Sequence, residues 1–470
     1  MFYKLPSSAK IPDVKRFSYN PNGESVGHDS LNHNEVIKMG SQFIATEDTL
    51  QEILISKYPI LLIDESQDTK KELVDSFFQV CAKHKAKFIL GMFGDTMQKI
   101  YMDGKDRLEN SIPEGWERPK KIMNHRSASR IVNLANAIRS TIDGQKQRAR
   151  SDAEEGIVRL FITSSATAKE EFERNIAKTM FEDTGDAGWQ DESTYKSLIL
   201  EHHMAASRFG FINLYEPLNK SGEFDTPLRD GSIPELSFLA NVVSPLVKAS
   251  LSGNDFEVLK IIRCHSPLFE RKTFAAECDQ ISILLKVEKA VESLIELWKN
   301  GKTPSCLDAL ESIKEHCLFK LGNHVNEILM ECIDGEDTKV STLRKALASP
   351  FDELEKYSAY VSGNTRFATH QGVKGLEFPR VMVIMDDIEA RGNNFSYDKL
   401  FGAKPKTDTD IKNERENKDT TIMRTTRLFY VACTRAQKSL AIVAYSNNTK
   451  AVKLTAIKNK WFTEDEIRIC

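Results

Sequence analysis

Short apolar runs along this chain alternate with longer stretches whose apolar positions recur at helical spacing. A helix is expected over residues 33–56, where Val36, Phe43 and Leu50 belong to such a stretch. The apolar runs predict strands at 59–63, 87–92, 157–162, 196–200, 380–385 and 439–444. Strands that alternate with helices are typical of an α/β fold with parallel sheets.

The middle of the chain has a different pattern. From 234 to 348 almost every apolar stretch has helical spacing, and strand signals are scarce. We interpret this region as an α-helical insertion between the two halves of an α/β domain. The polar, charged run at 403–420 predicts a mobile loop. Residues 1–30 are rich in Pro, Ser, Asn and Gly and predict irregular structure.

Length and composition set limits on this picture. A chain of 470 residues is too long for one ordinary core, so two or three domains are expected. The net charge of −3 does not indicate nucleic-acid binding by the chain as a whole. A local basic groove would still be sufficient to bind nucleic acid. The eight cysteines contain no C-x-x-C pair and fit no zinc pattern, so reduced thiols in the cytoplasm are expected. No stretch suits a membrane span or a signal peptide.

The apolar run at 59–63 ends in two adjacent carboxylates, Asp64 and Glu65. An unbroken run of isoleucine and leucine suits a buried strand of a parallel sheet, and open α/β sheets bind ligands at the carboxyl ends of their strands. One carboxylate can hold Mg²⁺, and the next can orient or deprotonate an attacking water, as in nucleotide hydrolysis. A buried strand followed by an acidic surface loop is the plain alternative.

A second apolar strand ends in Gly94 and Asp95, with Gln98 three residues further on. A glutamine there can bond a terminal phosphate or the water that attacks it. The ring of Tyr101 can stack on a nucleic-acid base. A strand, a turn and a core tyrosine would produce the same pattern.

Two arginines are candidates for contact with phosphate. The segment from Asn124 to Ser127 opens a predicted helix, where Arg126 can reach phosphate from a second domain. The segment from Arg427 to Ala436 predicts a helix with Arg435 at its end, placed to stabilise charge on a γ-phosphate as an arginine finger does. A capping asparagine and surface arginines are the alternatives.

A further segment, from Phe367 to Phe378, precedes the predicted strand at 380–385. Its threonine, lysine and glycine turn can engage a nucleic-acid backbone, and Glu377 can accept hydrogen bonds from ribose hydroxyls.

Together these segments resemble the motifs of the UvrD/Rep/PcrA family of superfamily 1 helicases. The resemblance covers residues 58–210 and 360–446. The matching segments, in chain order, are Asp64 to Asp68 (motif II), Gly94 to Tyr101 (motif III), Asn124 to Ser127 (motif IV), Thr369 to Phe378 (motif V) and Arg427 to Ala436 (motif VI).

The resemblance implies an α/β fold with two RecA-like parallel-sheet domains, ATP in the cleft between them and single-stranded DNA across their top. The expected parts are an incomplete first domain at 1–112, a second domain at 113–233 and 349–446, the helical insertion at 234–348 and a tail at 447–470.

The resemblance also implies roles in ATP hydrolysis. Asp64 would bind Mg²⁺, and Glu65 would be the catalytic base. Gln98 would sense the γ-phosphate, which Arg126 and Arg435 would contact.

Other implied roles concern the nucleoside and the DNA. Glu377 would meet the sugar, and His125 stands where the family usually has a base-stacking tyrosine, so stacking there would be weaker or different. Gln371 stands where motif V usually has histidine, and a histidine lies one position earlier. The candidate DNA contacts are Tyr101, Thr369, His370 and Lys374.

One element of the family has no counterpart. The family opens with a strand and a glycine-rich phosphate loop, but no G-x-x-x-x-G-K-[ST] motif occurs in this chain. Gly301-Lys302-Thr303 is a decoy, because Glu296 replaces the first glycine and a helical pattern precedes it. We therefore expect the loop to come from a missing N-terminal segment or a partner protein.

Two functional hypotheses follow. The first is an ATP-dependent 3′–5′ DNA helicase that is inactive as this chain alone. The alternative is a non-hydrolysing pseudo-helicase that binds DNA or a partner protein. Retention of Glu65, Gln98, Arg126 and Arg435 favours the first, because decayed enzymes usually lose such residues piecemeal. Members of the family act in DNA repair, plasmid replication and phage defence, and no motif selects among these pathways.

Overall fold

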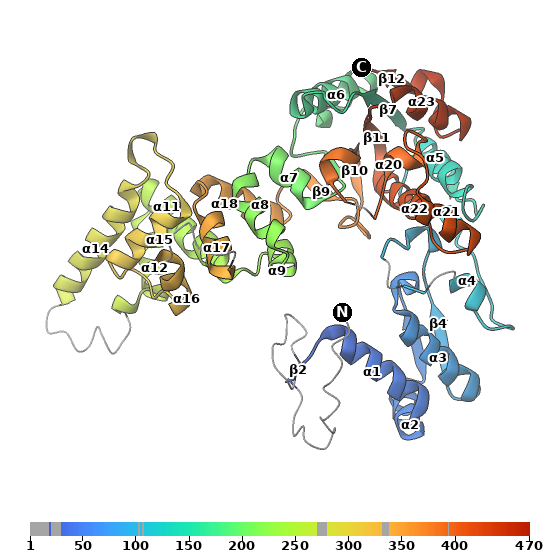
Figure 1. The fold of residues 1–470 in the computed structure, drawn as a ribbon, viewed down its shortest axis with the longest axis horizontal. Coiled ribbons are helices and arrows are strands. Elements are labelled where there is room, and N and C mark those ends of the chain that lie inside the picture. The colour runs from blue at the N-terminus through green and yellow to red at the C-terminus, as the bar shows by residue number, and fades with distance from the viewer. Residues whose placement is uncertain are drawn as a thin grey trace. The chain divides into compact units, whose positions relative to one another are not determined.

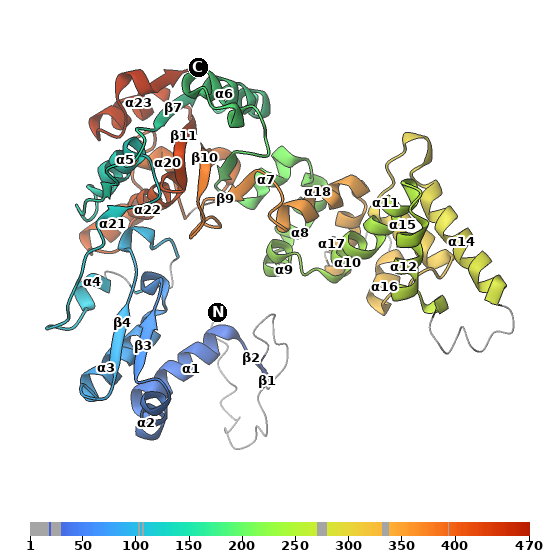
Figure 2. The same cartoon turned by 180° about the vertical axis from the view of Figure 1, so that it is seen from behind.

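The structure is a computed structural model that describes residues 18–19, 30–101, 104–105, 108–269, 280–330, 338–392 and 394–470 (Figures 1 and 2). The chain divides into two compact units. Unit 1 comprises residues 1–124, 135–148 and 406–431, and unit 2 comprises residues 125–134, 149–405 and 432–470. Each unit is described by itself.

Unit 1 contains a two-stranded parallel sheet with helices beside it. Its sheet pairs β3 (Ile60–Ile63) with β4 (Ile89–Met92). Its other elements are β1 (Ser18–Tyr19), β2 (Ser30–Leu31), α1 (His33–Thr46), α2 (Asp48–Lys57), the 3₁₀ turn η2 (Ser66–Asp68), α3 (Lys71–Lys83), the 3₁₀ turn η3 (Thr96–Gln98), α4 (Leu108–Ser111), β5 (Met123–Asn124) and α21 (Asp408–Arg415). The division between the units falls within β6 (Arg148–Ala149), α5 (Ser129–Arg139) and α22 (Thr421–Cys433).

The helix expected over 33–56 is two helices. A capping box starts α1, in which Asn32 accepts from the Glu35 amide and the Glu35 carboxylate accepts from the Asn32 amide. The backbone turns extended at Glu47, between α1 and α2. The spacing of apolar residues continues across this break, so periodicity alone did not reveal it.

The core of unit 1 lies on one face of its small sheet. Val74 and Phe78 of α3 pack with Phe88, Leu90 and other buried apolar residues, and the inward residues of β3 pack against this cluster. On the opposite face, Ile60, Leu62 and Ile89 are 57%, 62% and 61% exposed. The predicted burial of the strand at 59–63 is therefore wrong for one face, since among the described residues β3 and β4 pair only with each other.

Unit 2 contains a six-stranded sheet in the order β12-β7-β11-β10-β8-β9, and every neighbouring pair is parallel. Helix α6 (Lys169–Thr184) packs against β11, α23 (Thr449–Lys458) packs against β7, and α7 (His202–Phe209) packs against β8 and β9. The strands are β7 (Ile157–Thr163), β8 (Lys196–Ile199), β9 (Phe367–Thr369), β10 (Phe378–Met385), β11 (Ala436–Tyr445) and β12 (Ile467–Ile469). This sheet confirms the predicted α/β class with parallel strands.

The central strands of this sheet are buried on both faces. Residues 381–385 of β10 are at most 2% exposed, and residues 440–443 of β11 are fully buried. Continuous apolar strands of this kind are typical of parallel sheets with helices on both sides.

The helical region lies in the chain between β8 and β9, which pair directly with each other. It begins at α7, earlier than the predicted residue 234, because short amphipathic helices already follow β8. Its helices are α7 (His202–Phe209), α8 (Ile212–Ser221), α9 (Asp225–Asp230), α10 (Pro234–Phe238), the π-helix η5 (Leu239–Val243), α11 (Ser244–Leu251), α12 (Asp255–His265), η6 (Pro267–Phe269), α14 (Gln280–Glu296), η7 (Lys299–Gly301), α15 (Cys306–Glu315), α16 (Asn323–Met330), α17 (Lys339–Leu347) and α18 (Phe351–Val361).

Two segments differ from the sequence-based expectation. The run at 403–420 contains α21, whose Asp410 is 2% exposed and accepts from the Thr407 hydroxyl and the Thr421 amide, so it is held in place by local hydrogen bonds. Residues 447–470 are no tail, because they form α23 (Thr449–Lys458), η8 (Glu464–Glu466) and the edge strand β12. Unit 2 also contains α6 (Lys169–Thr184), η4 (Ala187–Trp189), α19 (Asp387–Ala390) and α20 (Tyr397–Leu400). Most of the irregular segment predicted at 1–30 lies outside the described residues.

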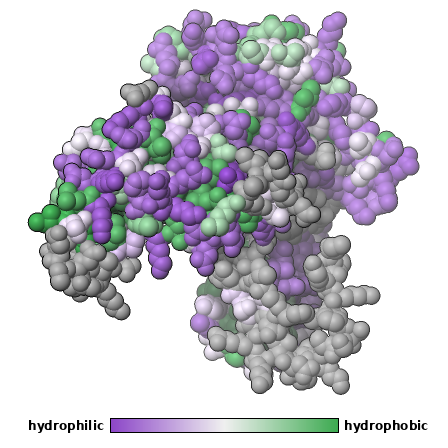
Figure 3. Space-filling view, turned by 60° about the vertical axis from the view of Figure 1, so that its left-hand side comes forward, coloured by the Kyte–Doolittle hydropathy of each residue, from purple (hydrophilic) through white to green (hydrophobic). Residues whose placement is uncertain are grey.

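The surface shown in Figure 3 is largely hydrophilic, with separate hydrophobic patches. Several apolar side chains of the helical region are exposed, among them Phe256 at 79% and Ile281 at 67%. Within the described parts of the chain, no helix combines the length and apolar character that crossing a membrane requires.

Candidate functional site

The two carboxylates of the acidic segment follow β3 directly. Because Ile63 is paired in parallel with Met92, the carboxyl ends of β3 and β4 meet at the same edge of the sheet. Asp64 and Glu65 are both exposed there. Glu65 has a left-handed backbone with φ 50°, and its amide donates to Asp64 Oδ1 at 2.9 Å. Such a turn presents carboxylate oxygens where α/β sheets bind ligands.

A buried glutamine joins the ends of the two strands. Gln67 is 2% exposed, its Nε2 donates to Glu65 Oε2 at 2.5 Å, and its Oε1 accepts from the Asp95 amide at 3.1 Å. A Cβ on Gly94 would lie 2.2 Å from Gln67 Oε1, so a side chain at residue 94 would displace this bridge. The acid segment and the turn after β4 therefore form one connected site.

The turn after β4 is held at both ends. Asp95 accepts from the Met97 amide at 3.0 Å and thereby caps η3, which carries Gln98. At the other end, Arg427 Nε donates to the Lys99 carbonyl at 2.7 Å. Tyr101, the predicted stacking residue, is 47% exposed.

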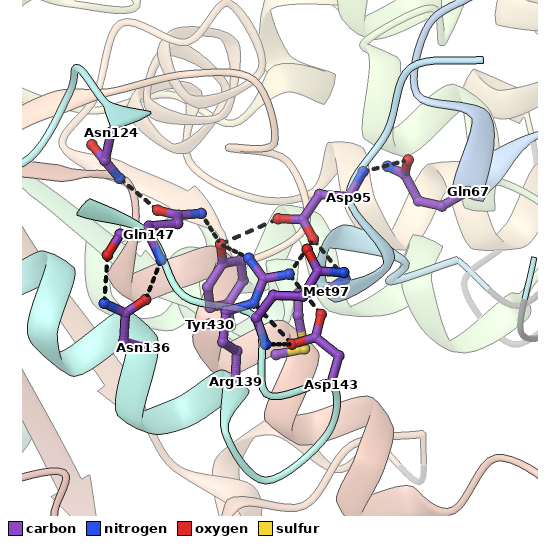
Figure 4. Close-up of polar contacts among 10 residues, drawn as sticks. Gln67, Asp95, Met97, Asn124, Asn136, Arg139, Asp143, Gln147 and Tyr430 are labelled. Carbon is purple, nitrogen blue, oxygen red and sulfur yellow. Dashed lines mark hydrogen bonds and ion pairs between the residues drawn. The ribbon is translucent and has the colours of Figure 1, made fainter. Parts of the chain in front are cut away.

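Asp95 also belongs to a buried ion-pair network (Figure 4). Arg139 is 4% exposed in its side chain and donates through Nη2 to Asp95 Oδ1 at 3.0 Å. It also donates to Asp143 through Nε at 3.0 Å and through Nη2 at 2.6 Å. Tyr430 donates to Asp95 Oδ2 at 3.2 Å. Burial opposes the guanidinium charge, but the bond to Asp143 and the nearby carboxylates raise the pKa of Arg139 above its ordinary value.

The network continues to the two short strands β5 and β6. Gln147 Nε2 donates to the Tyr430 hydroxyl at 2.8 Å, and Asn124 Nδ2 donates to Gln147 Oε1 at 2.8 Å (Figure 4). Gln147 and Asn136 also exchange backbone and side-chain hydrogen bonds at 2.7 and 2.8 Å. Asn124 therefore lies in β5 and does not cap a helix, since α5 begins at Ser129.

Three residues that were predicted to contact the nucleotide lie close together in unit 2. Arg126 Nε donates to Glu377 Oε2 at 2.6 Å, and Arg126 Nη1 donates to the Thr434 carbonyl at 3.3 Å. Arg435 follows the end of α22, is 1% exposed, and donates to the Leu376 carbonyl at 3.1 Å. Gln437 holds the other oxygen of Glu377 at 2.9 Å. Arg126 is thus paired with Glu377, while Arg435 is held by the carbonyl of the residue that precedes Glu377.

The predicted DNA-contact residues in the loop after β9 differ in how exposed their side chains are. Thr369 is 9% exposed, and its hydroxyl accepts from the Gly372 amide at 3.0 Å. Lys374 is partly exposed, and so is Gln371. His125, which stands for a stacking tyrosine, is exposed.

His370 does not fit the predicted DNA contact. It is fully buried, with Nε2 bonded to the Leu198 carbonyl at 3.0 Å and Nδ1 to the Tyr397 hydroxyl at 2.8 Å. Burial lowers the pKa of His370 to about 4. The ring is therefore neutral near pH 7 and packs in the core, where DNA cannot reach it.

Several polar residues of the site were not predicted. Gln67 stands inside the acidic motif, so its position was a usable signal. Arg139 lies in an amphipathic helix, where an arginine is usually expected on the exposed face. No feature of the neighbouring sequence indicates that its side chain is buried. Tyr430 and Gln437 lie within or beside motif VI, but their partners Asp95 and Glu377 are 335 and 60 residues away in the chain.

The donor set can be compared with the predicted cofactors. Asp64 and Glu65 offer exposed carboxylate oxygens, which are the ligands that Mg²⁺ prefers. Among the described residues, no group of three or more His, Cys, Asp or Glu side chains forms a metal site. The residues present fit the metal side of a Mg-ATP site, while the sequence carries no phosphate-loop motif.

Comparisons with known proteins find helicase-like sequence in two segments of the chain. Residues 24–102 match the family model of the UvrD/REP helicase N-terminal domain, and residues 341–447 match that of the UvrD-like helicase C-terminal domain. The chain is 27% identical over 464 residues to the Gabija protein GajB of Bacillus cereus (strain HuB5-5), covering 88% of this chain and 62% of that protein. The chain thus spans less than two thirds of that relative.

A shorter match is to the RecBCD enzyme subunit RecB of Buchnera aphidicola subsp. Schizaphis graminum (strain Sg). It is 39% identical over 71 residues, which are 15% of this chain and 6% of that protein. The two family matches contain motifs II and III and motifs V and VI, in the same order as the helicase domains. Over these two segments the chain is therefore similar to the N- and C-terminal domains of UvrD/Rep-like superfamily 1 helicases.

Proposed function

We propose that this chain is part of an ATP-dependent DNA helicase that moves 3′ to 5′ along single-stranded DNA. The observation that carries the proposal is the connection of Glu65, Gln67 and Asp95 at the shared edge of β3 and β4. It joins the proposed base to the turn that carries the proposed phosphate sensor, Gln98, as hydrolysis of a nucleotide requires.

In the complete protein, Asp64 would hold Mg²⁺, which neutralises phosphate charge when bound. Glu65 would orient or deprotonate water, with Gln67 fixing its carboxylate. Arg126 and Arg435 would contact the γ-phosphate, and Glu377 would accept from the ribose. Contact with nucleotide requires Arg126 and Glu377 to separate, because each is now the partner of the other.

We propose that the phosphate loop comes from outside residues 1–470, either from the same polypeptide or from a partner protein. Two observations support this. One face of the β3–β4 sheet is apolar and exposed, and the chain covers 62% of the length of GajB. A strand and helix that bring the loop would cover such a face.

A second candidate function is a pseudo-helicase that binds DNA or a partner without hydrolysis. The bonded state of these residues favours it, because Arg126 and Glu377 already pair with each other and Arg435 already donates to the Leu376 carbonyl. Retention of Glu65 and of Gln98, on turns that Gln67 connects, favours the first candidate.

The experiment is hydrolysis and translocation by the complete form, which includes the phosphate loop. Glu65→Gln should nearly abolish ATP hydrolysis and leave nucleotide binding largely intact. Arg435→Ala should reduce turnover by ~10³-fold or more. Near-normal turnover in either variant removes that residue from its role, and absence of turnover in the unchanged complete form supports the pseudo-helicase. Movement 5′ to 3′ would contradict the proposed polarity.

A further inference from the structure

A short, strongly basic region of unit 1 has no assigned role. Lys120 and Lys121 precede β5, and Lys146 and Arg148 flank the start of β6; all four are exposed. The Arg148 amide donates to the Ile122 carbonyl at 2.7 Å, so the two segments lie side by side. We call residues 118–124 and 144–148 the basic ribbon.

The charges of the basic ribbon are not balanced locally. No Asp or Glu occurs in either of its two segments. Within the described residues, none of Lys120, Lys121, Lys146 and Arg148 forms an ion pair with a carboxylate. By contrast, Lys83 and Lys105 of the same unit are each paired with an aspartate. Four unpaired cations on one small element favour a polyanionic ligand.

The ribbon backbone is held by partly buried hydrogen bonds. Asn124 on one strand bonds Gln147 beside the other, and Gln147 is bonded in turn to Tyr430 and Asn136 (Figure 4). The four cations are therefore carried on a fixed element. A preorganised element loses less conformational entropy on binding than a free loop.

Apolar side chains accompany these cations. Ile122 is 55% exposed and Met123 is 38% exposed, between the two lysines and Asn124. Cations beside exposed apolar groups suit a ligand with charged phosphates and apolar base faces. Single-stranded nucleic acid has both features.

We propose that the basic ribbon binds the phosphodiester backbone of single-stranded DNA. This site lies outside the motif III and motif V residues to which DNA contact was assigned. This inference depends on the proposed function in one respect, because it requires that the chain binds DNA.

The test is the salt dependence of binding to a fluorescent oligothymidylate, with residues 1–470 as they stand. The ribbon variant combines Lys120→Gln, Lys121→Gln, Lys146→Gln and Arg148→Gln. Each phosphate contact to a single strand contributes about 0.7 to the slope of log affinity against log salt. We expect the slope to become shallower by about 2–3 and affinity at about 50 mM salt to fall at least about tenfold.

The matched control removes the same charge elsewhere. Lys85, Lys87, Lys450 and Lys458 are exposed and, in the part of the chain that the structure describes, form no ion pair. Their combined replacement by Gln should leave the slope within about 0.5 of the unchanged chain. Equal losses in both variants would overturn the ribbon, because net charge alone would then explain the effect.

Other outcomes separate the two proposals. Binding by the unchanged chain with an unaltered slope in the ribbon variant overturns the ribbon and leaves DNA binding intact. No binding by the unchanged chain at any salt overturns both. Displacement of the oligonucleotide from the ribbon by polyglutamate at equal charge concentration would assign the ribbon to an acidic protein and overturn the nucleic-acid proposal.

If the fourfold ribbon variant does not fold, single replacements still test the proposal. Single replacements Lys120→Gln and Lys146→Gln are both on the surface, and each should reduce the slope by about 0.7. Circular dichroism checks that their folding is unchanged, and an unchanged slope in both variants overturns the proposal.

Discussion

The six-stranded sheet of unit 2 and the β3–β4 sheet of unit 1 have similar apolar strands and very different surroundings. In unit 2, residues 381–385 of β10 have a neighbouring strand on either side and are at most 2% exposed. In unit 1, β3 has one described neighbour, and Ile60 and Leu62 are more than half exposed. An apolar run therefore predicts a strand that is stable when buried. Whether the strand is buried depends on the neighbouring strands and helices among the described residues.

The units also differ in what holds their functional turns. The strands of unit 2 are fixed by apolar packing on both faces. The turn after β4 in unit 1 is held by Arg139, Asp95, Asp143 and Tyr430, which are charged or polar and mostly buried. Buried ion pairs of this kind are costly to break by removing one partner.

The largest effect is expected from Arg139→Met. The substitution leaves Asp95 and Asp143 without their shared cation and should destabilise unit 1 by about 3–5 kcal/mol. Hydrogen exchange in increasing urea, read on peptides of each unit, measures this loss. Lys83→Met is the control, since its ion pair with Asp48 is exposed. Equal stability of unit 1 in Arg139→Met and in the unchanged chain would contradict the role given to the network.

The next effect compares one residue from each sheet. Ile384→Ala in β10 removes a fully buried side chain and should cost about 2–5 kcal/mol. Leu62→Ala in β3 removes a side chain that is 62% exposed and should cost less than about 1 kcal/mol. Urea unfolding of each unit, followed by the same exchange measurement, compares the two. Similar losses for both variants would mean that the face of β3 is covered in solution.

A smaller effect depends on pH and is confined to unit 2. The pKa of buried His370 is lowered from 6.5 to about 4, so the unfolded chain binds a proton first as the pH falls. The stabilising contribution is complete above pH 6.5 and is lost between pH 6.5 and about 4, by at most about 3 kcal/mol. His370→Gln should flatten the stability of unit 2 over this window. An unchanged pH profile would argue against burial of a neutral ring.

Much of the architecture was predictable from local pattern. All six predicted strands are present, because apolar runs of this length have few alternatives between helical stretches. The break at Glu47 and the order at 403–420 were missed, since Asp410 and Thr407 stabilise that segment through side-chain bonds that hydropathy does not register. The edge strand at 467–469 was missed because three residues are too few for a pattern.

The site was predictable only where a motif carries its chemistry in adjacent residues. Asp64 and Glu65 follow β3 and the turn that carries Gln98 follows β4, so their placement at one sheet edge was predictable, while their catalytic roles stay predictions. His370 shows the opposite, because its place in the motif suggests exposure while Leu198 and Tyr397 enclose it. Arg139 could not be found, since its partner Asp95 is 44 residues away and its helix has an ordinary amphipathic pattern.

We propose that unit 1 carries the catalytic acid residues and the phosphate sensor of a nucleotide site, and that the loop that grips the β-phosphate comes from outside residues 1–470. Loss of two or three charge-assisted hydrogen bonds, each worth ~1.5–3 kcal/mol, would weaken ATP binding by roughly 10²- to 10⁶-fold. The direct test is DNA-stimulated ATP hydrolysis by purified residues 1–470, with Glu65→Gln as the blank. We expect turnover no higher than the blank. Robust turnover above it would contradict the account, because residues 1–470 would then contain a phosphate-binding element of their own.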